Sequence, residues 1–308
     1  MLPPTVAPPP PSQSPVEIVS GVLRANHRFS ADIVDKAVAI FGDEWSDRFD
    51  ADIAAMFPTH EGLMAAVKGY AGFAMTSLRL QARFERSGRY ESKSYAEAAE
   101  QVYHNPQYMQ SEYLPGLFLS HYLWPHHYRQ IRFFETAFLE PLAVAGTASF
   151  VEVGIGTGLY SRIALQELPA VRGRGLDISE SSKAFAERQL AAFGVSDRYE
   201  VAIEDVTLAT PDDSAEALIC VEVLEHLEDP VGFLRALRRV LKPGGRAFIT
   251  AALNAAHTDH IYLYSNAGEI EAQLIEAGFA SEQYFVGQAY PPSRPGIPVP
   301  LAAAFVVS

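Results

Sequence analysis

The sequence predicts an α/β protein in which an all-helical N-terminal region precedes a sheet of mainly parallel strands. From residue 16 to about residue 142, apolar residues recur at helical spacing and no segment alternates as a strand does. After Gly146, short apolar segments alternate with helical ones, the pattern of parallel strands joined by crossover helices. The chain has 308 residues, 48% of them apolar, which is enough to build both parts.

Three regions are expected. Residues 1–15 are a proline-rich, poorly ordered tail that lacks the basic start and apolar centre of a secretion signal. Residues 16–142 form a helical domain, and residues 143–308 form the α/β domain. We expect no membrane-spanning segment, because no apolar stretch approaches the length that crosses a bilayer.

Helix boundaries in the N-terminal half are predicted from capping residues. A first helix is expected to begin at Ser30 and to end at Gly42, and a second to follow Asp50 and stop at Pro58. A long amphipathic helix should then run from Thr59 to a glycine at position 88.

The C-terminal half is predicted to hold seven strands and four helices. The strands are expected at Ser149–Val153, Gly173–Asp177, Tyr199–Ile203, Ala217–Val221, Arg246–Ala252, Ala280–Val286 and Leu301–Val307. The helices are expected at Leu159–Leu168, Ser179–Phe193, Pro230–Val240 and Ala267–Ala277. The segment from Lys242 to Gly245 is interpreted as a turn before the fifth strand.

A stretch dense in tyrosine and histidine follows the long predicted helix. Its tyrosines are Tyr108, Tyr113, Tyr122 and Tyr128, and at helical spacing such residues favour core packing over pocket lining. Its histidines are His121, His126 and His127. A metal site is not favoured there, because Pro125 interrupts the helix and no acidic residue keeps ligand spacing. These histidines are expected at the surface or at the rim of a pocket.

Phe150 to Tyr160 reads FVEVGIGTGLY, an apolar strand that breaks into three closely spaced glycines. Gly154, Gly156 and Gly158 allow a tight turn and close approach to a ligand, and the helix that follows favours an anionic group at its N-terminus. Asp177 lies roughly 20 residues further on, at the end of the second strand, where an acid binds ribose hydroxyls.

The glycine spacing departs from the nicotinamide-binding pattern. The third glycine of that pattern would stand where Leu159 is, and it comes one residue early, at Gly158. The loop resembles motif I of the class I S-adenosylmethionine (SAM)-dependent methyltransferases. The segments IEDV, EALICVEVLEHLEDP and LKPGGRAFIT agree with that family in order and spacing, so the resemblance covers about half of the chain, from Phe150 to the C-terminus.

This resemblance implies a Rossmann-like seven-stranded methyltransferase sheet that binds SAM. The N-terminal helical domain would then cap the substrate or form a homodimer surface. The cofactor-binding residues implied are Glu152, Gly154, Gly156 and Gly158 near the methionine part, Asp177 and Ile178 at the ribose, and Asp205 and Val206 near the adenine.

Glu222, Glu225 and His226 follow the fourth strand. If the backbone turns helically there, offsets of zero, three and four place them on one face, where they can hold a divalent cation. The arrangement is similar to one in small-RNA 3′-terminal 2′-O-methyltransferases and in ubiquinone-pathway catechol O-methyltransferases. By that resemblance the ligands are these three residues and His260, with His257 as a substitute. Mg²⁺ is bound in the first group, and this mixed nitrogen and oxygen set also suits manganese, iron or zinc.

Other interpretations of the same residues stay open. Without a metal, Glu222 would touch the cofactor, and His226 or His260 would act as a catalytic general base. O-methylation of a small organic acceptor is the leading hypothesis, and C-methylation beside a 2-oxo acid carbonyl is the alternative. A nicotinamide-dependent oxidoreductase would need a catalytic pair such as Y-x-x-x-K, which we do not find. A non-catalytic SAM-binding protein is the third class.

Net charge and cysteine content indicate which class of partner and which cellular compartment the sequence favours. The net charge of −13 argues against nucleic acid, whose binders carry a basic face, and favours a small-molecule substrate. The single cysteine, Cys220, fits a reducing, cytoplasmic compartment and lies in an apolar strand where a packing role is expected.

Overall fold

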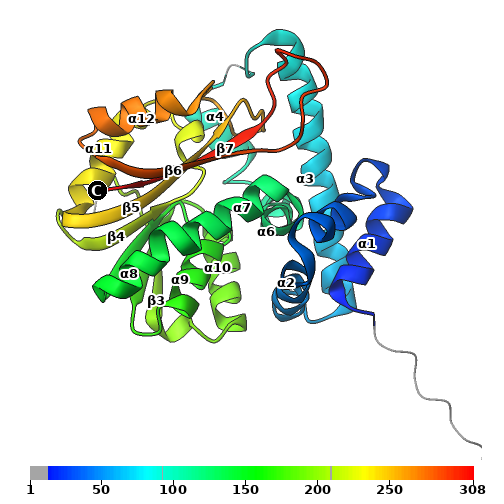
Figure 1. Cartoon of the computed structure of the whole chain (residues 1–308), viewed down its shortest axis with the longest axis horizontal. Coiled ribbons are helices and arrows are strands. Elements are labelled where there is room, and N and C mark those ends of the chain that lie inside the picture. The colour runs from blue at the N-terminus through cyan, green and yellow to red at the C-terminus, as the bar shows by residue number, and fades with distance from the viewer. Residues whose placement is uncertain (1–12, 92, 209) are drawn as a thin grey trace, which may run out of the picture.

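The computed structural model describes residues 13–91, 93–208 and 210–308. It has an α/β half and a helical half that lie side by side (Figure 1). Residues 1–12 of the predicted tail lie outside the described residues. Ser14 and Pro15, which we had assigned to the tail, instead begin the first helix: the Ser14 side chain accepts a hydrogen bond from the Glu17 N–H, and Pro15 occupies the first turn.

Within the described residues, the N-terminal region contains helices and no strand, as predicted. Its helices are α1 (Pro15–Asn26), α2 (Ile33–Met56), α3 (His60–Ser87), α4 (Tyr95–Gln101), α5 (Pro106–Tyr108), α6 (Leu114–Leu123), α7 (Pro125–Phe133) and α8 (Glu140–Ala145). π-Helical turns at Met109–Tyr113 and Phe134–Leu139 join some of them. Helix α8 crosses the predicted domain boundary at 142/143.

Of the six predicted helix boundaries, three are confirmed and three are wrong. Helix α2 ends at Met56, with Phe57 as its C-cap, directly before Pro58. Thr59 caps α3, and Gly88 ends it in a left-handed conformation. Ser30 ends a 3₁₀ turn instead of capping α2. Gly42 (φ +73°) only kinks α2, which therefore also contains Asp50. The apolar face continues beyond the glycine with Trp45 and Phe49, which are fully buried, and tertiary packing overrides the local stop signal.

The sheet has the strand order β3-β2-β1-β4-β5-β7-β6, with β7 antiparallel to both β5 and β6. The strands are β1 (Ser149–Val153), β2 (Arg172–Asp177), β3 (Tyr199–Ile203), β4 (Ala215–Cys220), β5 (Leu241–Leu253), β6 (Ser281–Gln288) and β7 (Leu301–Val307). The crossover helices are α9 (Leu159–Glu167), α10 (Glu180–Ala192), α11 (Pro230–Val240) and α12 (Ala267–Glu276). All seven predicted strands are present, within a few residues at most ends.

The predicted turn at Lys242–Gly245 falls inside the bounds of β5, but none of its four residues pairs with β4 or β7. The segment is part of β5, where the register against β4 shifts between Ala215 and Ala217. Gly244 has a φ of +77°, and the chain bulges out of the ladder between Leu241 and Arg246.

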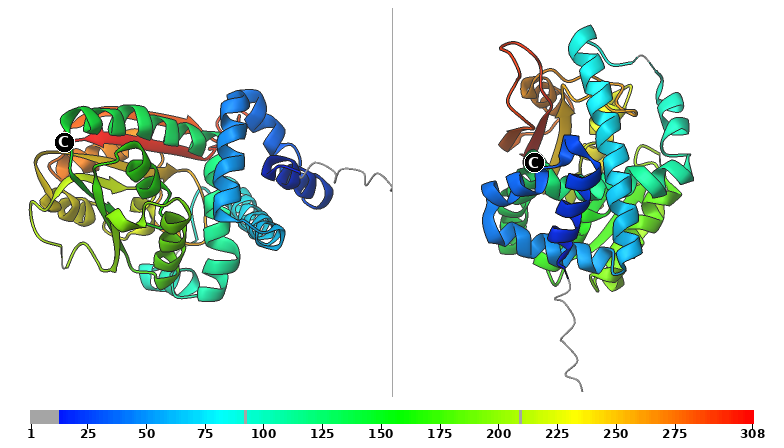
Figure 2. Two further views of the ribbon diagram at one scale, coloured as in Figure 1. Left: turned by 90° about the horizontal axis from the view of Figure 1, so that it is seen from below. Right: turned by 90° about the vertical axis from the view of Figure 1, so that its right-hand side faces the viewer.

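The two faces of the sheet bury different cores. Val151, Leu218 and Ile249 point to the face that α11 and α12 cover. Phe150 and Phe248 point to the opposite face, whose core continues through α9 and α10 into the helical half. Figure 2 shows the long helix α3 running beside the sheet half. The helical region is therefore anchored by the same apolar core as one face of the sheet.

None of the helices in the described part of the chain is long and apolar enough to cross a bilayer.

Candidate functional site

A cavity of about 1240 Å³ opens at the carboxyl ends of the parallel strands, where open α/β sheets bind their ligands. Its lining comes from the strand ends, from the helical half and from both ends of the β6–β7 loop, including Tyr290 and Pro300. The volume exceeds the range of roughly 300–1,000 Å³ that is typical for one small ligand. The cavity has room for a cofactor and an acceptor together.

The glycine loop forms one wall. Gly154, Gly156 and Gly158 all have positive φ angles, of +73°, +51° and +78°. Gly154 and Gly156 line the cavity, whereas Gly158 lies behind them and begins α9. The Gly156 N–H donates to Oδ2 of Asp177 over 3.0 Å, which links the loop to the end of β2.

The other predicted cofactor residues line the same cavity: Glu152, Asp177, Ile178, Asp205 and Val206. Asp177 also accepts from the Ser179 N–H, and Asp205 accepts from the backbone and hydroxyl of Thr207. The carboxylates are thus oriented by backbone donors.

Glu152 is buried beneath the loop, 2% exposed, and accepts hydrogen bonds from the backbone N–H and the hydroxyl of Ser161. Burial raises the pKa of Glu152 to about 8, against these hydrogen bonds, which lower it.

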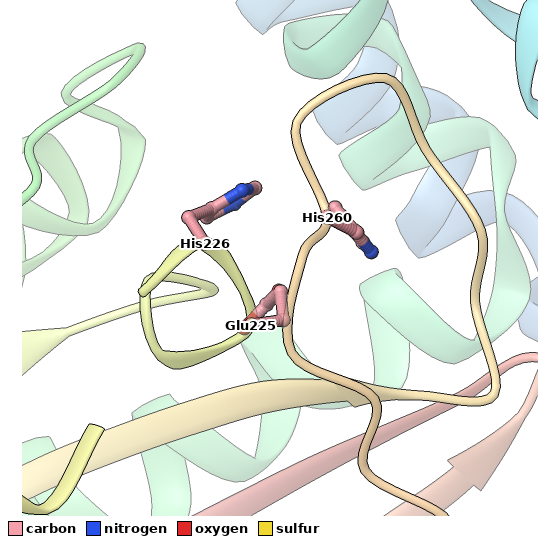
Figure 3. A group of neighbouring side chains, drawn as sticks. All are labelled: Glu225, His226 and His260. Atoms are coloured by element: carbon pink, nitrogen blue, oxygen red, sulfur yellow. The ribbon is translucent and has the colours of Figure 1, made fainter. Parts of the chain in front are cut away.

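A second wall carries Glu225, His226 and His260. One potential ligand atom from each residue lies within 4.8 Å of the others. Figure 3 shows that they come from two loops that face each other, one after β4 and one after β5. Both carboxylate oxygens of Glu225 are buried without a hydrogen-bond partner.

The backbone sets the tautomer of both histidines. His226 Nδ1 lies 3.0 Å from the carbonyl oxygen of Asp259, and His260 Nδ1 lies 2.6 Å from that of Ala255. A carbonyl only accepts, so each Nδ1 carries a hydrogen, and in the neutral form of either ring the lone pair is on Nε2. Burial lowers the pKa of His260 to about 3 and keeps it neutral. The two imidazoles can therefore ligate a metal or accept a proton at Nε2.

Glu222 departs from the predicted helical geometry. Its φ is +53°, and only Leu224–His226 form a helical turn, of the 3₁₀ type. Glu222 lines the cavity but is not part of the three-residue group; its Oε1 accepts from the Thr250 hydroxyl over 2.6 Å. Burial raises the pKa of Glu222, and burial together with Glu222 raises that of Glu225.

Sequence reasoning missed Asp259, which is fully buried and joins several site residues. Its carboxylate accepts from His257 Nδ1 over 2.8 Å and from the hydroxyls of Tyr103 and Tyr113 over 3.0 and 2.6 Å. Burial alone would raise the pKa of Asp259, but the neighbouring His226 and the hydrogen bond from His257 hold it well below its ordinary value. His257 thus pairs with Asp259 through Nδ1 and lies outside the three-residue group, and its Nε2 is buried without a hydrogen-bond partner. The sequence signal for Asp259 was the motif H-T-D-H at residues 257–260, in which the aspartate stands between two histidines.

Sequence reasoning also missed a helical segment that crosses the ends of three strands. The Tyr95 N–H donates to Glu228, Lys93 Nζ donates to the carbonyl of Thr258, and the Ser179 hydroxyl donates to the carbonyl of Tyr103. Tyr95 lines the cavity, and burial and the nearby Asp205 and Asp177 raise its pKa. Tyr95 therefore lies near the Asp205 and Asp177 carboxylates.

The tyrosine- and histidine-rich stretch contributes both to core packing and to the lining of the cavity. Tyr113, Tyr122 and Tyr128 are buried, and Tyr113 also lines the cavity. His121, His126 and His127 all line the cavity, and His121 and His126 are only 5% exposed, so they are pocket residues and not surface ones.

Strand order, glycine loop and cavity define a Rossmann-like protein that binds its ligands at the carboxyl ends of its strands. Residues 151–249 match the family described as "Methyltransferase domain". This match covers about a third of the chain and agrees with the resemblance to the class I SAM-dependent methyltransferases.

Among curated proteins, the chain is 35% identical over 104 residues to a ubiquinone biosynthesis O-methyltransferase of Pseudomonas syringae pv. tomato, covering 32% of this chain and 42% of that protein. It is 34% identical over 115 residues to the protein of the same name in Pseudomonas savastanoi pv. phaseolicola, covering 36% and 47%. The chain thus spans less than half the length of these relatives.

Among solved structures, mitomycin 7-O-methyltransferase MmcR has a similar fold. The TM-score is 0.53 at 17% identity, covering 82% of this chain and 74% of that one. At this identity the likeness concerns the fold alone.

Proposed function

We propose that this protein transfers a methyl group from SAM to an oxygen atom of a small organic acceptor, with help from a divalent cation. The observation that supports this is the single cavity lined both by the glycine loop with its acidic neighbours and by Glu225, His226 and His260. The curated relatives are named as O-methyltransferases, which favours oxygen over carbon as the acceptor atom.

The glycine loop and Glu152 would bind the methionine part of the cofactor. Asp177, with Ile178 beside it, would accept hydrogen bonds from the ribose, and Asp205 with Val206 would face the adenine. This assignment follows from the rule that an acid at the end of the second strand binds ribose hydroxyls. The Gly156 hydrogen bond holds the Asp177 carboxylate next to the loop.

The residues present fit a divalent cation. The Glu225 carboxylate is buried with no donor, and two imidazoles offer Nε2 lone pairs beside it. A buried carboxylate in this state needs either a proton or a cation. Two nitrogens and a carboxylate suit manganese, iron or zinc as well as magnesium. Glu222 would act as a neighbour of the site and not as a direct ligand.

When bound, a divalent cation lowers the pKa of a hydroxyl that it holds. The chain's own contribution is to align the acceptor, exclude water and receive its proton. With a cation bound, Nε2 of His226 and His260 would be occupied as ligands. In the metal-free alternative, these two Nε2 atoms are the ones that would accept the proton, because both Nδ1 atoms face backbone carbonyls.

The cofactor part is tested by calorimetry on the full chain. S-adenosylhomocysteine should bind and NAD should not, and Asp177→Ala should weaken binding at least about tenfold. Binding of NAD instead would point to an oxidoreductase.

The metal part is tested by elemental analysis of protein purified without chelator. Glu225→Gln should lose the metal, whereas Glu228→Gln, on the same loop but outside the group, should keep it. A wild-type protein that neither contains nor is activated by any divalent metal rejects this part and leaves His226 and His260 as the candidate bases.

A further inference from the structure

We propose that the acceptor is a planar aromatic molecule of at least two fused rings, bound along a wall of rings that leads from the candidate catalytic histidines into the helical half. This proposal rests on the proposed function for the end at which methylation occurs. The residues of this aromatic wall are His260, His257, Phe73, Trp124 and His126, and all five line the cavity.

The aromatic wall is continuous. The ring centroids of His257 and His260 are 5.7 Å apart, and those of Phe73 and His257 are 4.7 Å apart. Phe73 stacks on Trp124 at 5.7 Å, and Trp124 stacks on His126 at 5.9 Å with only 10° between their planes. Each step lies in the range at which aromatic rings attract one another. The wall therefore extends several ring widths beyond the histidines.

Two contacts hold the middle of the wall in place. A Cβ at Gly116 of α6 would lie 2.3 Å from Cβ of Phe73, so only glycine there lets α3 bring Phe73 so close. The indole N–H of Trp124 donates to the Tyr70 hydroxyl over 3.1 Å. Rings fixed in this way offer a rigid binding surface, which loses little entropy when a ligand binds.

The rings at the inner end of the wall carry no charge of their own, and Arg129 is the charged group near His126. Burial lowers the pKa of His126 well below its ordinary value and that of the neighbouring His127 to about 4, so both rings are neutral at pH 7. Trp124 and Phe73 add no charge. A flat, apolar body with its hydroxyl at the His260 end matches this surface.

A single-ring acceptor held beside His260 would contact only the first two rings of the aromatic wall, His260 and His257. The remaining rings, and much of the 1240 Å³ that cofactor and acceptor share, would stay uncovered. Each further fused ring would stack on another member of the wall. We therefore expect affinity to rise about tenfold for each added ring.

The test compares catechol with 2,3-dihydroxynaphthalene by calorimetry on the full chain with S-adenosylhomocysteine present; 2-naphthol serves as a two-ring probe without the paired hydroxyls. The two-ring diol should bind about tenfold more tightly than catechol. Phe73→Leu and Trp124→Leu should abolish that ratio and change catechol binding little. Phe133→Leu is the matched control, because Phe133 stacks on Phe285 and is not among the lining residues.

Circular dichroism must show that each variant folds, and Trp124→Phe, which keeps a ring, should retain part of the ratio. Equal affinity for one and two rings, or a ratio that survives in both leucine variants, overturns this proposal and leaves methyl transfer untouched. If 2-naphthol binds through Phe73 and Trp124 but no hydroxyl is ever methylated, the wall stands and the proposed function fails.

Discussion

The hydroxyl of Tyr113, in the helical half, donates a hydrogen bond to Oδ2 of Asp259, in the loop after β5, over 2.6 Å. The same carboxylate accepts from Tyr103 and from His257, and the Asp259 carbonyl holds Nδ1 of His226. Asp259 thereby connects the helical half to the candidate catalytic histidines.

Asp259→Asn should lower kcat about 10- to 100-fold, the usual cost of losing a residue that orients metal ligands or bases. The amide cannot accept from all of its present donors, so the loop that carries His257 and His260 loses its orientation. Metal affinity should fall with kcat, while the Kd of S-adenosylhomocysteine stays unchanged. Equal losses in kcat and in cofactor affinity would indicate general misfolding. Tyr113→Phe removes one donor only and should have a much smaller effect.

The buried ion pair between Asp52 of α2 and Arg162 of α9 should stabilise the junction of the two halves. Asp52 Oδ2 and Arg162 Nη2 lie 2.7 Å apart, and the two side chains are only 8% and 3% exposed. Asp52→Ala leaves a buried guanidinium without its partner and should reduce the free energy of unfolding by about 3–5 kcal/mol.

The control for that experiment is Asp35→Ala, which removes the partner of Arg24 in a pair more than half exposed on both sides. Asp35→Ala should reduce the free energy of unfolding, measured with urea, by less than about 1 kcal/mol. Similar losses in the two variants would contradict a stabilising role for burial at the junction.

Gly158 is required for two reasons that one control variant separates. Its φ is +78°, and a Cβ there would lie 2.8 Å from Cβ of Ala186. Gly194 has a φ of +68° with open space around it, so Gly194→Ala reports the backbone cost alone, about 1–2 kcal/mol. Gly158→Ala should cost more and should weaken S-adenosylhomocysteine binding, because α9 must shift away from α10. If thermal unfolding and calorimetry show the two variants to be alike, the packing contact is unimportant.

Glu152 should make the ligand-free protein less stable as pH rises. Its pKa is about 8 in the folded state against an ordinary value of 4.5, so between these values the folded chain binds more protons than the unfolded chain. Stability contributed by this group is full below pH 4.5 and declines by about 1.4 kcal/mol per pH unit toward pH 8.

Glu152→Gln should flatten that decline, which urea unfolding at several pH values would measure. Glu222 and Glu225 titrate in the same direction, so the informative quantity is the difference between variant and wild type at each pH. A difference that does not change with pH would show that Glu152 is not protonated in the folded state.

Local patterns predicted the sheet well. The strands at Ser149–Val153, Tyr199–Ile203 and Leu301–Val307 begin and end as expected, and the three glycines of the loop, all with positive φ angles, form the expected tight turn. Apolar periodicity and the permitted φ of glycine are properties of a few adjacent residues. They can therefore be read without knowing the rest of the fold.

The sequence by itself determined the α/β class, the glycine loop with Asp177, and the pairing of Glu225 with His226 and His260. Only the tertiary structure decided that Glu222 has a left-handed backbone conformation and accepts a hydrogen bond from Thr250. It also decided that Asp259 accepts a hydrogen bond from Tyr113, and that Phe73 and Trp124 extend the cavity into the helical half. Tyr113 and Asp259 are 146 residues apart in the chain, and nothing in either neighbourhood specifies the other. Such contacts arise because the shared apolar core brings the helices against the sheet, and that packing is a property of the whole chain.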